Sequence, residues 1–376
     1  MEFALYDHGH GYYHSGVAIG RRGDFATSAT LSDTLGRALA AWILEHEPAH
    51  LIEVGAGTGQ LARAILQPLG GHALRRWGLP NPFRRGLTYH IVERSPRLQA
   101  EQRKLLGRSV RWHRTLEDAL EAAGGSATIF SNELVDAFPV RVFRRDDQWQ
   151  ELHLVLEDGQ ITEDWRSCHR LPVSTLFEES WPAGQRLEVH ESYRHWLAAW
   201  LPRWNSGQLL TIDYGGAPTE IYHRAPAGSL RAYSHHERLV GPELYTLPGR
   251  RDLTADVNFD DLVSWSEALG IETVSLATQR GFLLPHLAPN DLSAADRFLT
   301  DPDGAGTAFK VLLQKRSRGA LPEREFQSQS SSVSRTPHPV YFPTCSEFSP
   351  PPSSSSSRST HPPSNCPAVP RRSWWA

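Results

Sequence analysis

Apolar residues recur at two spacings along the first 317 positions of the chain. Stretches with an apolar side chain every three or four positions, as at 35–43 and 193–201, are typical of amphipathic helices. Other apolar runs are short and suit buried strands, at 51–54, 89–93, 111–112, 127–130, 208–215, 272–276 and 309–314. Because strands that alternate with helices favour a parallel sheet covered on both faces, the pattern predicts a doubly wound, mostly parallel α/β fold.

The alternation of helices and strands is interrupted twice. Short alternating runs around a Glu-Asp-Gly turn at 157–159 are typical of antiparallel hairpins inserted into an α/β unit. Further along, a long polar loop is predicted to carry Arg231 and Tyr233. We therefore expect insertions or substrate-side elements at about 140–206 and 216–257.

Composition changes sharply after residue 317. Ser and Pro crowd the segment 318–376, which has few aliphatic side chains to bury, so a disordered tail is expected to follow a globular domain at 1–317. The formal net charge of −3 provides no general attraction to nucleic acid or membrane. The chain has three cysteines without disulfide or metal-ligand spacing, which favours a reducing compartment. It shows neither a membrane-spanning apolar run nor a secretory signal.

The segment 51–66 indicates a strand, a tight turn and a helix. Gly55, Gly57 and Gly59 permit unusual backbone angles, and a chain without Cβ atoms lets a ligand approach. Glu53 lies inside the strand, where a carboxylate is costly unless something pairs with it. A tight connection without a ligand is the alternative interpretation. The order E-x-G-x-G-x-G resembles motif I of the class I S-adenosylmethionine (SAM) methyltransferases and differs from the G-x-G-x-x-G of dinucleotide sites.

Further polar residues are predicted at the carboxyl ends of neighbouring strands, where open α/β sheets bind ligands. Glu93 ends the second strand, a position suited to the two hydroxyls of a ribose, with a solvated strand end as the alternative. Asn132 and Glu133 follow the fourth strand, and Asp136 comes within one further turn. For this group the alternative is a helix cap with solvated acids.

Other chemistries find little support in the sequence. The 18 histidines form no HExxH or comparable spacing, so no metal site is predicted, and no G-x-S-x-G elbow marks a serine hydrolase. The pair His235 and His236 is interpreted as part of a polar loop in preference to a ligand or a base.

Several segments together resemble the MidA family of SAM-dependent methyltransferases, whose mitochondrial members act as a respiratory complex I assembly factor and modify arginine. The matching segments, in the family's order, are ALYDHGHGYY, GDFATS, EVGAGTGQLA, YHIVERSP, SNELVDAFPV, LLTIDYG, GSLRAYSHHE, DLTADVNF, TQRGFLL and FKVLLQ. They span residues 4–314. The resemblance implies a seven-stranded Rossmann-like methyltransferase sheet, SAM as the cofactor, and an arginine acceptor in a protein substrate such as a complex I subunit. It implies the mitochondrial matrix for a eukaryotic source and the cytoplasm for a bacterial one, and leaves a homodimer open.

The resemblance also implies roles for matching residues. Those implied to bind SAM are Glu53 for its ammonium, Glu93 for its ribose, Gly55, Gly57 and Gly59 for its methionine part, and Gly23, Asp24, Phe25 and Ser28 as a closing segment. Asn132 and Glu133 are implied beside the sulfonium and the incoming nucleophile. A guanidinium has a pKa above ~12 and is therefore positively charged at neutral pH. As a methyl acceptor it needs carboxylates that orient it through bidentate hydrogen bonds and balance its charge as the proton leaves. Glu133 and Asp136 are the candidates for this work.

The sequence departs from the family pattern at three places. A helix usually carried upstream of the ALYD segment is missing, Ala29 and Thr30 replace Pro-Glu, and Asp256 replaces a histidine. Two other functions stay open, a methyltransferase of the same fold acting on a small molecule and a non-catalytic assembly protein. A dehydrogenase is disfavoured, because the glycine spacing differs and Glu53 precedes the turn.

Overall fold

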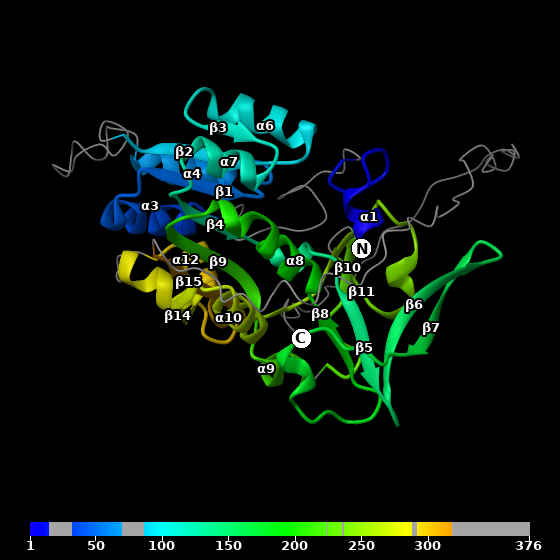
Figure 1. The fold of residues 1–376 in the computed structure, drawn as a ribbon. Helices are drawn as coiled ribbons and strands as arrows, with labels where there is room; N and C mark the ends of the chain where they lie inside the picture. The colour runs from blue at the N-terminus through cyan, green and yellow to red at the C-terminus, as the bar shows by residue number, and fades with distance from the viewer. Residues whose placement is uncertain (15–31, 70–85, 224, 235–236, 288–291, 318–376) are drawn as a thin grey trace, which may run out of the picture. The chain divides into compact units, whose positions relative to one another are not determined.

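The structure, a computed structural model, describes residues 1–14, 32–69, 86–223, 225–234, 237–287 and 292–317 (Figure 1). The chain divides into two units, Met1–Pro322 and Glu323–Ala376, and all described residues belong to the first. The tail predicted at 318–376 lies outside the described residues. Within the described ranges, no helix is both long and apolar enough to cross a bilayer.

The described elements alternate between strands and helices over most of the first unit. The main sheet contains β1 (His50–Val54), β2 (Thr88–Val92), β3 (Arg111–His113), β4 (Thr128–Asn132), β9 (Gly207–Gly216), β13 (Val257–Asn258), β14 (Glu272–Thr278) and β15 (Phe309–Arg316). The α-helices are α1 (Glu2–Tyr6), α3 (Thr34–His46), α4 (Gln60–Leu69), α6 (Pro96–Leu106), α7 (Leu116–Ala122), α8 (Glu191–Trp200), α9 (Pro218–Tyr222), α10 (Phe259–Ala268), α11 (Gln279–Leu283), α12 (Ala294–Leu299) and α13 (Ala305–Ala308). Short 3-10 helices are η2 (Val135–Ala137), η3 (Thr175–Phe177), η4 (Leu201–Arg203), η5 (Gly241–Tyr245) and η6 (Leu284–His286).

The strand order of the main sheet is β14-β15-β9-β4-β1-β2-β3. The pairs β9–β4, β4–β1, β1–β2 and β2–β3 are parallel, whereas β15 runs antiparallel to both β9 and β14. This order confirms the predicted mostly parallel seven-stranded sheet. The two-residue β13 pairs with β9 outside this path and brings the sheet to eight strands.

Each face of the main sheet carries a hydrophobic layer, because successive strand residues point to opposite sides. One layer joins Ile52, Val54, Ile129 and Leu209 of the sheet to apolar residues of α7, α8 and α10. The other joins Leu51, Ile91, Phe130 and Ile212 to apolar residues of α3 and α4, which lie side by side in Figure 1. This two-sided burial explains why the strands read as continuous apolar runs in the sequence.

Two smaller antiparallel sheets interrupt the α/β alternation. One has the order β7-β6-β5-β8 and consists of β5 (Arg141–Arg145), β6 (Trp149–Glu157), β7 (Gln160–Ser167) and β8 (Arg186–Val189). The other has the order β11-β10-β12 and consists of β10 (Arg231–Ser234), β11 (Glu237–Leu239) and β12 (Asp252–Thr254). The prediction of hairpins in the first insertion is therefore confirmed.

The prediction of a long polar loop around Arg231 and Tyr233 is wrong, because both residues lie on β10, which pairs with β11 and β12. The pairing satisfies the backbone of a segment that has no apolar alternation of its own. Arg231 is buried, and its burial depends on an ion pair with Asp256, which is distant in sequence. His235 and His236 lie outside the described residues.

Candidate active site

The glycine turn between β1 and α4 has the backbone that only glycine adopts easily. Gly55, Gly57 and Gly59 have φ values of 74°, 53° and 81°. A Cβ atom on Gly55 would lie 2.7 Å from the Leu134 side chain, so a residue larger than glycine would also crowd the segment after β4. A Cβ atom on Gly57 would have no described atom within 4 Å, because this glycine faces open space. A Cβ atom on Gly59 would lie 3.3 Å from Gln102 of α6, so this glycine serves packing.

Glu53 is a buried carboxylate directly before this turn. Its side chain is 2% exposed, and Tyr89 Oη on the neighbouring β2 donates a hydrogen bond to Glu53 Oε2 at 2.8 Å. Burial raises the pKa of Glu53 to about 7, and the Tyr89 hydrogen bond opposes this rise. A cation beside Glu53 would stabilise its ionised form.

Glu93 follows β2 and is held at the tip of that strand. Its Oε1 accepts the Ser95 amide at 2.8 Å, and its Oε2 accepts Gln102 Nε2 at 3.2 Å. Gln102 Nε2 also donates to the carbonyl of Gly57 at 2.8 Å, which fixes the glycine turn relative to Glu93. Burial raises the pKa of Glu93 to about 7, against the effect of these hydrogen bonds.

The segment after β4 carries Asn132, Glu133 and Asp136. Glu133 has a φ of 51°, a backbone angle that residues with a Cβ atom rarely adopt and that costs about 1–3 kcal/mol. The Asn132 amide donates to Glu133 Oε1 at 3.1 Å, and Asn132 Oδ1 is buried without a partner among the described residues. The strained backbone therefore turns Asn132 and Glu133 toward each other at the tip of the strand.

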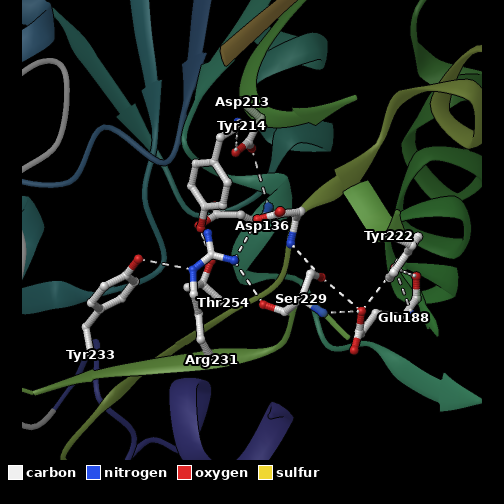
Figure 2. A network of polar contacts seen from close by, with 10 residues as sticks. Asp136, Glu188, Asp213, Tyr214, Tyr222, Ser229, Arg231, Tyr233 and Thr254 are labelled. Atoms are coloured by element: carbon white, nitrogen blue, oxygen red, sulfur yellow. Dashed lines mark hydrogen bonds and ion pairs between the residues drawn. The ribbon is translucent and has the colours of Figure 1, made fainter. Parts of the chain in front are cut away.

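Asp136 lies on η2 and is held through one of its two oxygens. Thr254 Oγ1 donates to Asp136 Oδ2 at 2.7 Å, and Tyr214 Oη donates to the same oxygen (Figure 2). Asp136 Oδ1 has no hydrogen-bond partner among the described residues. Burial raises the pKa of Asp136, whereas the bonds from Tyr214 and Thr254 and the charge of Arg231 lower it. Asp136 is therefore a buried acid with one oxygen held by two hydroxyl donors and the other left without a partner among the described residues.

A cavity of about 400 Å³ brings these groups together. It is lined by predicted site residues from three neighbouring strand ends, namely Glu53, Gly55, Gly57, Glu93, Asn132, Glu133 and Asp136. Gly59 does not line it and packs against α6 instead. The predicted closing residues Gly23, Asp24, Phe25 and Ser28 lie outside the described residues.

Sequence reasoning missed three residues that line the same cavity. Tyr6 Oη donates to the carbonyl of Ala137 at 2.9 Å, and Tyr13 Oη donates to Asp252 Oδ1 at 3.0 Å. The two tyrosine rings stack with centroids 5.6 Å apart, and Asp252 is buried. The segments ALYDHGHGYY and DLTADVNF contain these residues and matched the family pattern, but nothing local in either segment indicates a shared site.

The residues that line the cavity fit SAM. Two buried carboxylates, Glu53 on β1 and Glu93 just after the neighbouring β2, complement an ammonium and a pair of hydroxyls. The open space at Gly57 gives a ligand access to the backbone. The cavity volume also falls within the range of about 300–1,000 Å³ typical of small-molecule sites.

Comparisons with known proteins agree with this geometry. A family model described as S-adenosyl-L-methionine-dependent methyltransferase matches residues 34–276. The chain is 27% identical over 363 residues to the mitochondrial protein arginine methyltransferase NDUFAF7 homolog of Drosophila melanogaster, covering 80% of this chain and 77% of that protein. It is also 27% identical over 323 residues to the mitochondrial protein arginine methyltransferase NDUFAF7 of Danio rerio, covering 73% and 68%.

A solved structure shows the same fold. The crystal structure of a COG1565 superfamily member from Burkholderia thailandensis bound to S-adenosyl-homocysteine matches with a TM-score of 0.70 and 29% identity, covering 85% of this chain and 88% of that one. The sheet order, the cavity at the glycine turn and the family match over more than half of the sequence agree. The chain therefore belongs to the family of S-adenosyl-L-methionine-dependent methyltransferases.

Proposed function

We propose that this methyltransferase acts on the guanidinium group of an arginine in a protein substrate. The observation that supports this acceptor best is the unpartnered oxygen of buried Asp136, beside Glu133 and Asp252 in the cavity that also contains the glycine turn. A guanidinium presents several N–H donors in one plane and a positive charge, so it complements several carboxylates at once. The relatives named as protein arginine methyltransferases support the same acceptor.

The cofactor end of the cavity is assigned to the glycine turn and the two strand tips beside it. In this proposal Glu53 binds the ammonium of SAM, Glu93 binds the ribose hydroxyls, and the backbone at Gly55 and Gly57 contacts the methionine part. Burial makes these carboxylates sensitive to a partner, because an ionised group in a low-dielectric site is stabilised strongly by a cation or a donor. Gly23, Asp24, Phe25 and Ser28 are proposed to close this end of the site.

The acceptor end is assigned to Asn132, Glu133 and Asp136. When bound, SAM supplies a methyl group activated by a sulfonium, so the protein mainly has to position the acceptor and exclude water. Asp136 Oδ1 and Glu133 orient the guanidinium through hydrogen bonds, and one of these carboxylates takes the proton that the attacking nitrogen loses. The Asn132 amide holds Glu133 in place for this step.

The inserted segments at 140–206 and 216–257 are proposed to form the substrate side of the domain. Asp252 of the second segment lines the cavity, and Thr254 of the same segment donates a hydrogen bond to the lining residue Asp136. By family resemblance we further propose a respiratory complex I subunit as the substrate and, for a eukaryotic source, the mitochondrial matrix as the compartment. The printed names of the Drosophila melanogaster and Danio rerio relatives are mitochondrial.

The proposal is tested by labelling an extract of cells that lack this protein. The purified protein is added with methyl-labelled SAM, and modified residues are identified by mass spectrometry. We expect label on an arginine of one or a few proteins, and much less label with a Glu133→Gln variant that binds S-adenosyl-homocysteine normally in calorimetry. Label confined to small molecules, or none although the wild type binds S-adenosyl-homocysteine, would overturn the protein acceptor. Full labelling by Glu133→Gln would remove Glu133 from the mechanism.

A further inference from the structure

Beneath the acceptor end lies a polar network that the reaction scheme above does not use. Tyr214 is the residue after Asp213 on β9, and its hydroxyl contacts Asp136 and Thr254. Arg231 lies over the Tyr214 ring, with its Cζ atom 4.9 Å from the ring centroid. Figure 2 shows the hydroxyl end of Tyr214, Asp136 and the Arg231 guanidinium gathered close together. A buried cation thus lies next to both the tyrosine and the carboxylate to which the tyrosine donates.

Arg231 is held in this place by several partners. Its side chain is 7% exposed and makes an ion pair with Asp256 at 2.6 Å. It also donates to the Ser229 carbonyl at 2.9 Å and to Tyr233 Oη at 3.1 Å. A buried charge is costly unless it is paired. This set of partners therefore fixes the guanidinium in one orientation. Its planar face is then available for the ring of Tyr214.

The network continues from Arg231 into the larger inserted sheet. Asp256 and Arg231 both bond to Ser229, whose amide and hydroxyl donate to Glu188 of β8 at 2.9 Å. Tyr222 Oη donates to the same Glu188 oxygen at 3.0 Å. The position of Arg231 is therefore set by both inserted sheets, whereas Tyr214 and Asp136 come from the main sheet and the segment after β4.

Charged, titratable and hydroxyl groups face Asp136 from several elements. They are Asp213 and Tyr214 from β9, Arg231 from β10, Asp252 and Thr254 from β12, Tyr6 from α1, Tyr13 from the segment after α1, and Glu133 from its own segment. The acids in this set favour a neutral Asp136, because like charges at close range raise the cost of ionisation. Arg231 opposes them as a fixed positive charge, and Tyr214 and Thr254 oppose them as hydrogen-bond donors.

We propose that Tyr214 and Arg231 are positioning residues for Asp136. The Tyr214 hydroxyl binds Asp136 Oδ2, and together with the nearby Arg231 guanidinium it favours the ionised form of Asp136 and fixes the orientation of its carboxylate. This inference rests on the proposed function for its role in transfer, but the state of Asp136 is measurable without any acceptor. The inserted sheets, by fixing Arg231, then set the charge state of a residue in the site.

The test compares Tyr214→Phe and Arg231→Met with a matched control, Tyr222→Phe, which removes the same hydroxyl from a buried tyrosine at the far end of the network. Infrared difference spectra against Asp136→Asn follow the protonated carboxylic acid of Asp136 as pH is varied. Each Tyr214 and Arg231 variant is expected to raise the proton affinity of Asp136 at least tenfold, with S-adenosyl-homocysteine affinity within threefold of wild type. Tyr222→Phe is expected to leave the titration unchanged. Should Arg231→Met fail to fold, Arg231→Gln and Tyr214→Phe decide the question.

Transfer kinetics supply the second measurement. With an arginine acceptor, Tyr214→Phe is expected to lower kcat about tenfold or more at neutral pH, with a smaller change in KM and recovery toward alkaline pH. An unchanged Asp136 titration in both variants, or the same shift in Tyr222→Phe, would overturn the positioning role. If instead the wild type methylates no arginine, the proposed function fails, while the infrared titration still decides whether Tyr214 and Arg231 control Asp136.

Discussion

The carboxylate of Asp213 on β9 accepts the backbone amide of Val135 at 2.8 Å. The same Oδ2 atom also accepts the amides of Leu134 at 3.1 Å and Asp136 at 3.4 Å. One buried side chain thus fixes three successive amides after Glu133, whose backbone is strained. The end of β4 keeps its unusual shape because the neighbouring strand provides an acceptor for amides that no helix or sheet satisfies.

Replacing Asp213 with alanine should therefore damage both stability and the acceptor end. A buried donor left unpaired costs about 1–3 kcal/mol, so we expect the free energy of unfolding to fall by at least about 2 kcal/mol. Turnover should fall more than tenfold, with S-adenosyl-homocysteine affinity changed less than threefold, because Glu53 and Glu93 stay in place. Denaturant unfolding, calorimetry and transfer assays measure the three quantities.

The control for this variant is Asp261→Ala on α10. Asp261 is also buried, and it accepts the Thr175 amide at 2.7 Å and the Ser174 hydroxyl at 2.7 Å. It does not line the cavity, so its loss should cost similar stability without lowering turnover. Equal loss of turnover in both variants would show that activity merely follows stability.

Glu53 and Glu93 predict a pH dependence of cofactor binding. Burial raises the pKa of both groups from 4.5 to about 7, so each binds a proton in the free protein below neutral pH. An ammonium or hydroxyl donors favour the ionised forms, so S-adenosyl-homocysteine affinity should rise as pH increases to about 7 and level off above it. Binding slightly below neutral pH should release protons, which calorimetry in buffers of different ionisation enthalpy measures.

The Glu53→Gln variant should bind S-adenosyl-homocysteine at least about tenfold more weakly, and its binding should release fewer protons than binding to the wild type. The same pKa shifts change the free energy of unfolding in the opposite direction with pH. A folded-state pKa above the unfolded value means that the free protein loses stability as pH rises from about 4.5 to 7, by linkage. Proton release that is the same in wild type and Glu53→Gln would contradict the assignment of Glu53.

Gly57→Ala should weaken cofactor binding as well as folding. The new Cβ atom meets no described atom within 4 Å, but a φ of 53° costs an alanine about 1–2 kcal/mol. Because Gly57 lines the cavity, we expect S-adenosyl-homocysteine affinity to fall at least tenfold. Gly270→Ala is the matched control, since Gly270 has a φ of 76°, open space around its Cβ position and no place in the cavity lining. Equal effects of both variants on binding would contradict a ligand at Gly57.

Asp252→Asn should affect the acceptor and spare the cofactor. The substitution keeps the size of the side chain and an oxygen that accepts from Tyr13, but removes a negative charge from the acceptor end. We expect the KM for an arginine acceptor to rise about tenfold, with unchanged S-adenosyl-homocysteine affinity. Tyr13→Phe retains the charge and should change KM less. A larger effect of Tyr13→Phe would indicate that the hydrogen bond matters more than the charge.

Local patterns in the sequence predict the cofactor end of the site well. The run of apolar residues before Gly55 specifies β1, the glycines specify the turn, and Glu53 and Glu93 stand out as acids in or at the end of strands. These signals are readable because strand period, helix period and turn chemistry depend on residues only a few positions apart. Helix α6 was missed because its few buried residues sit among many charged ones.

The tertiary structure alone decided the acceptor end. Tyr6 bonds to a carbonyl 131 positions away, Thr254 reaches Asp136 across 118 positions, and Tyr13 reaches Asp252 across 239. No helix or strand periodicity links residues so far apart. Nothing in the sequence distinguishes a buried cation such as Arg231 from a solvent-exposed one. The sequence by itself determined the sheet, the glycine turn and the acids at its edge. Which distant side chains partner those acids, and so set their charge, depends on how the inserted sheets pack against the main sheet.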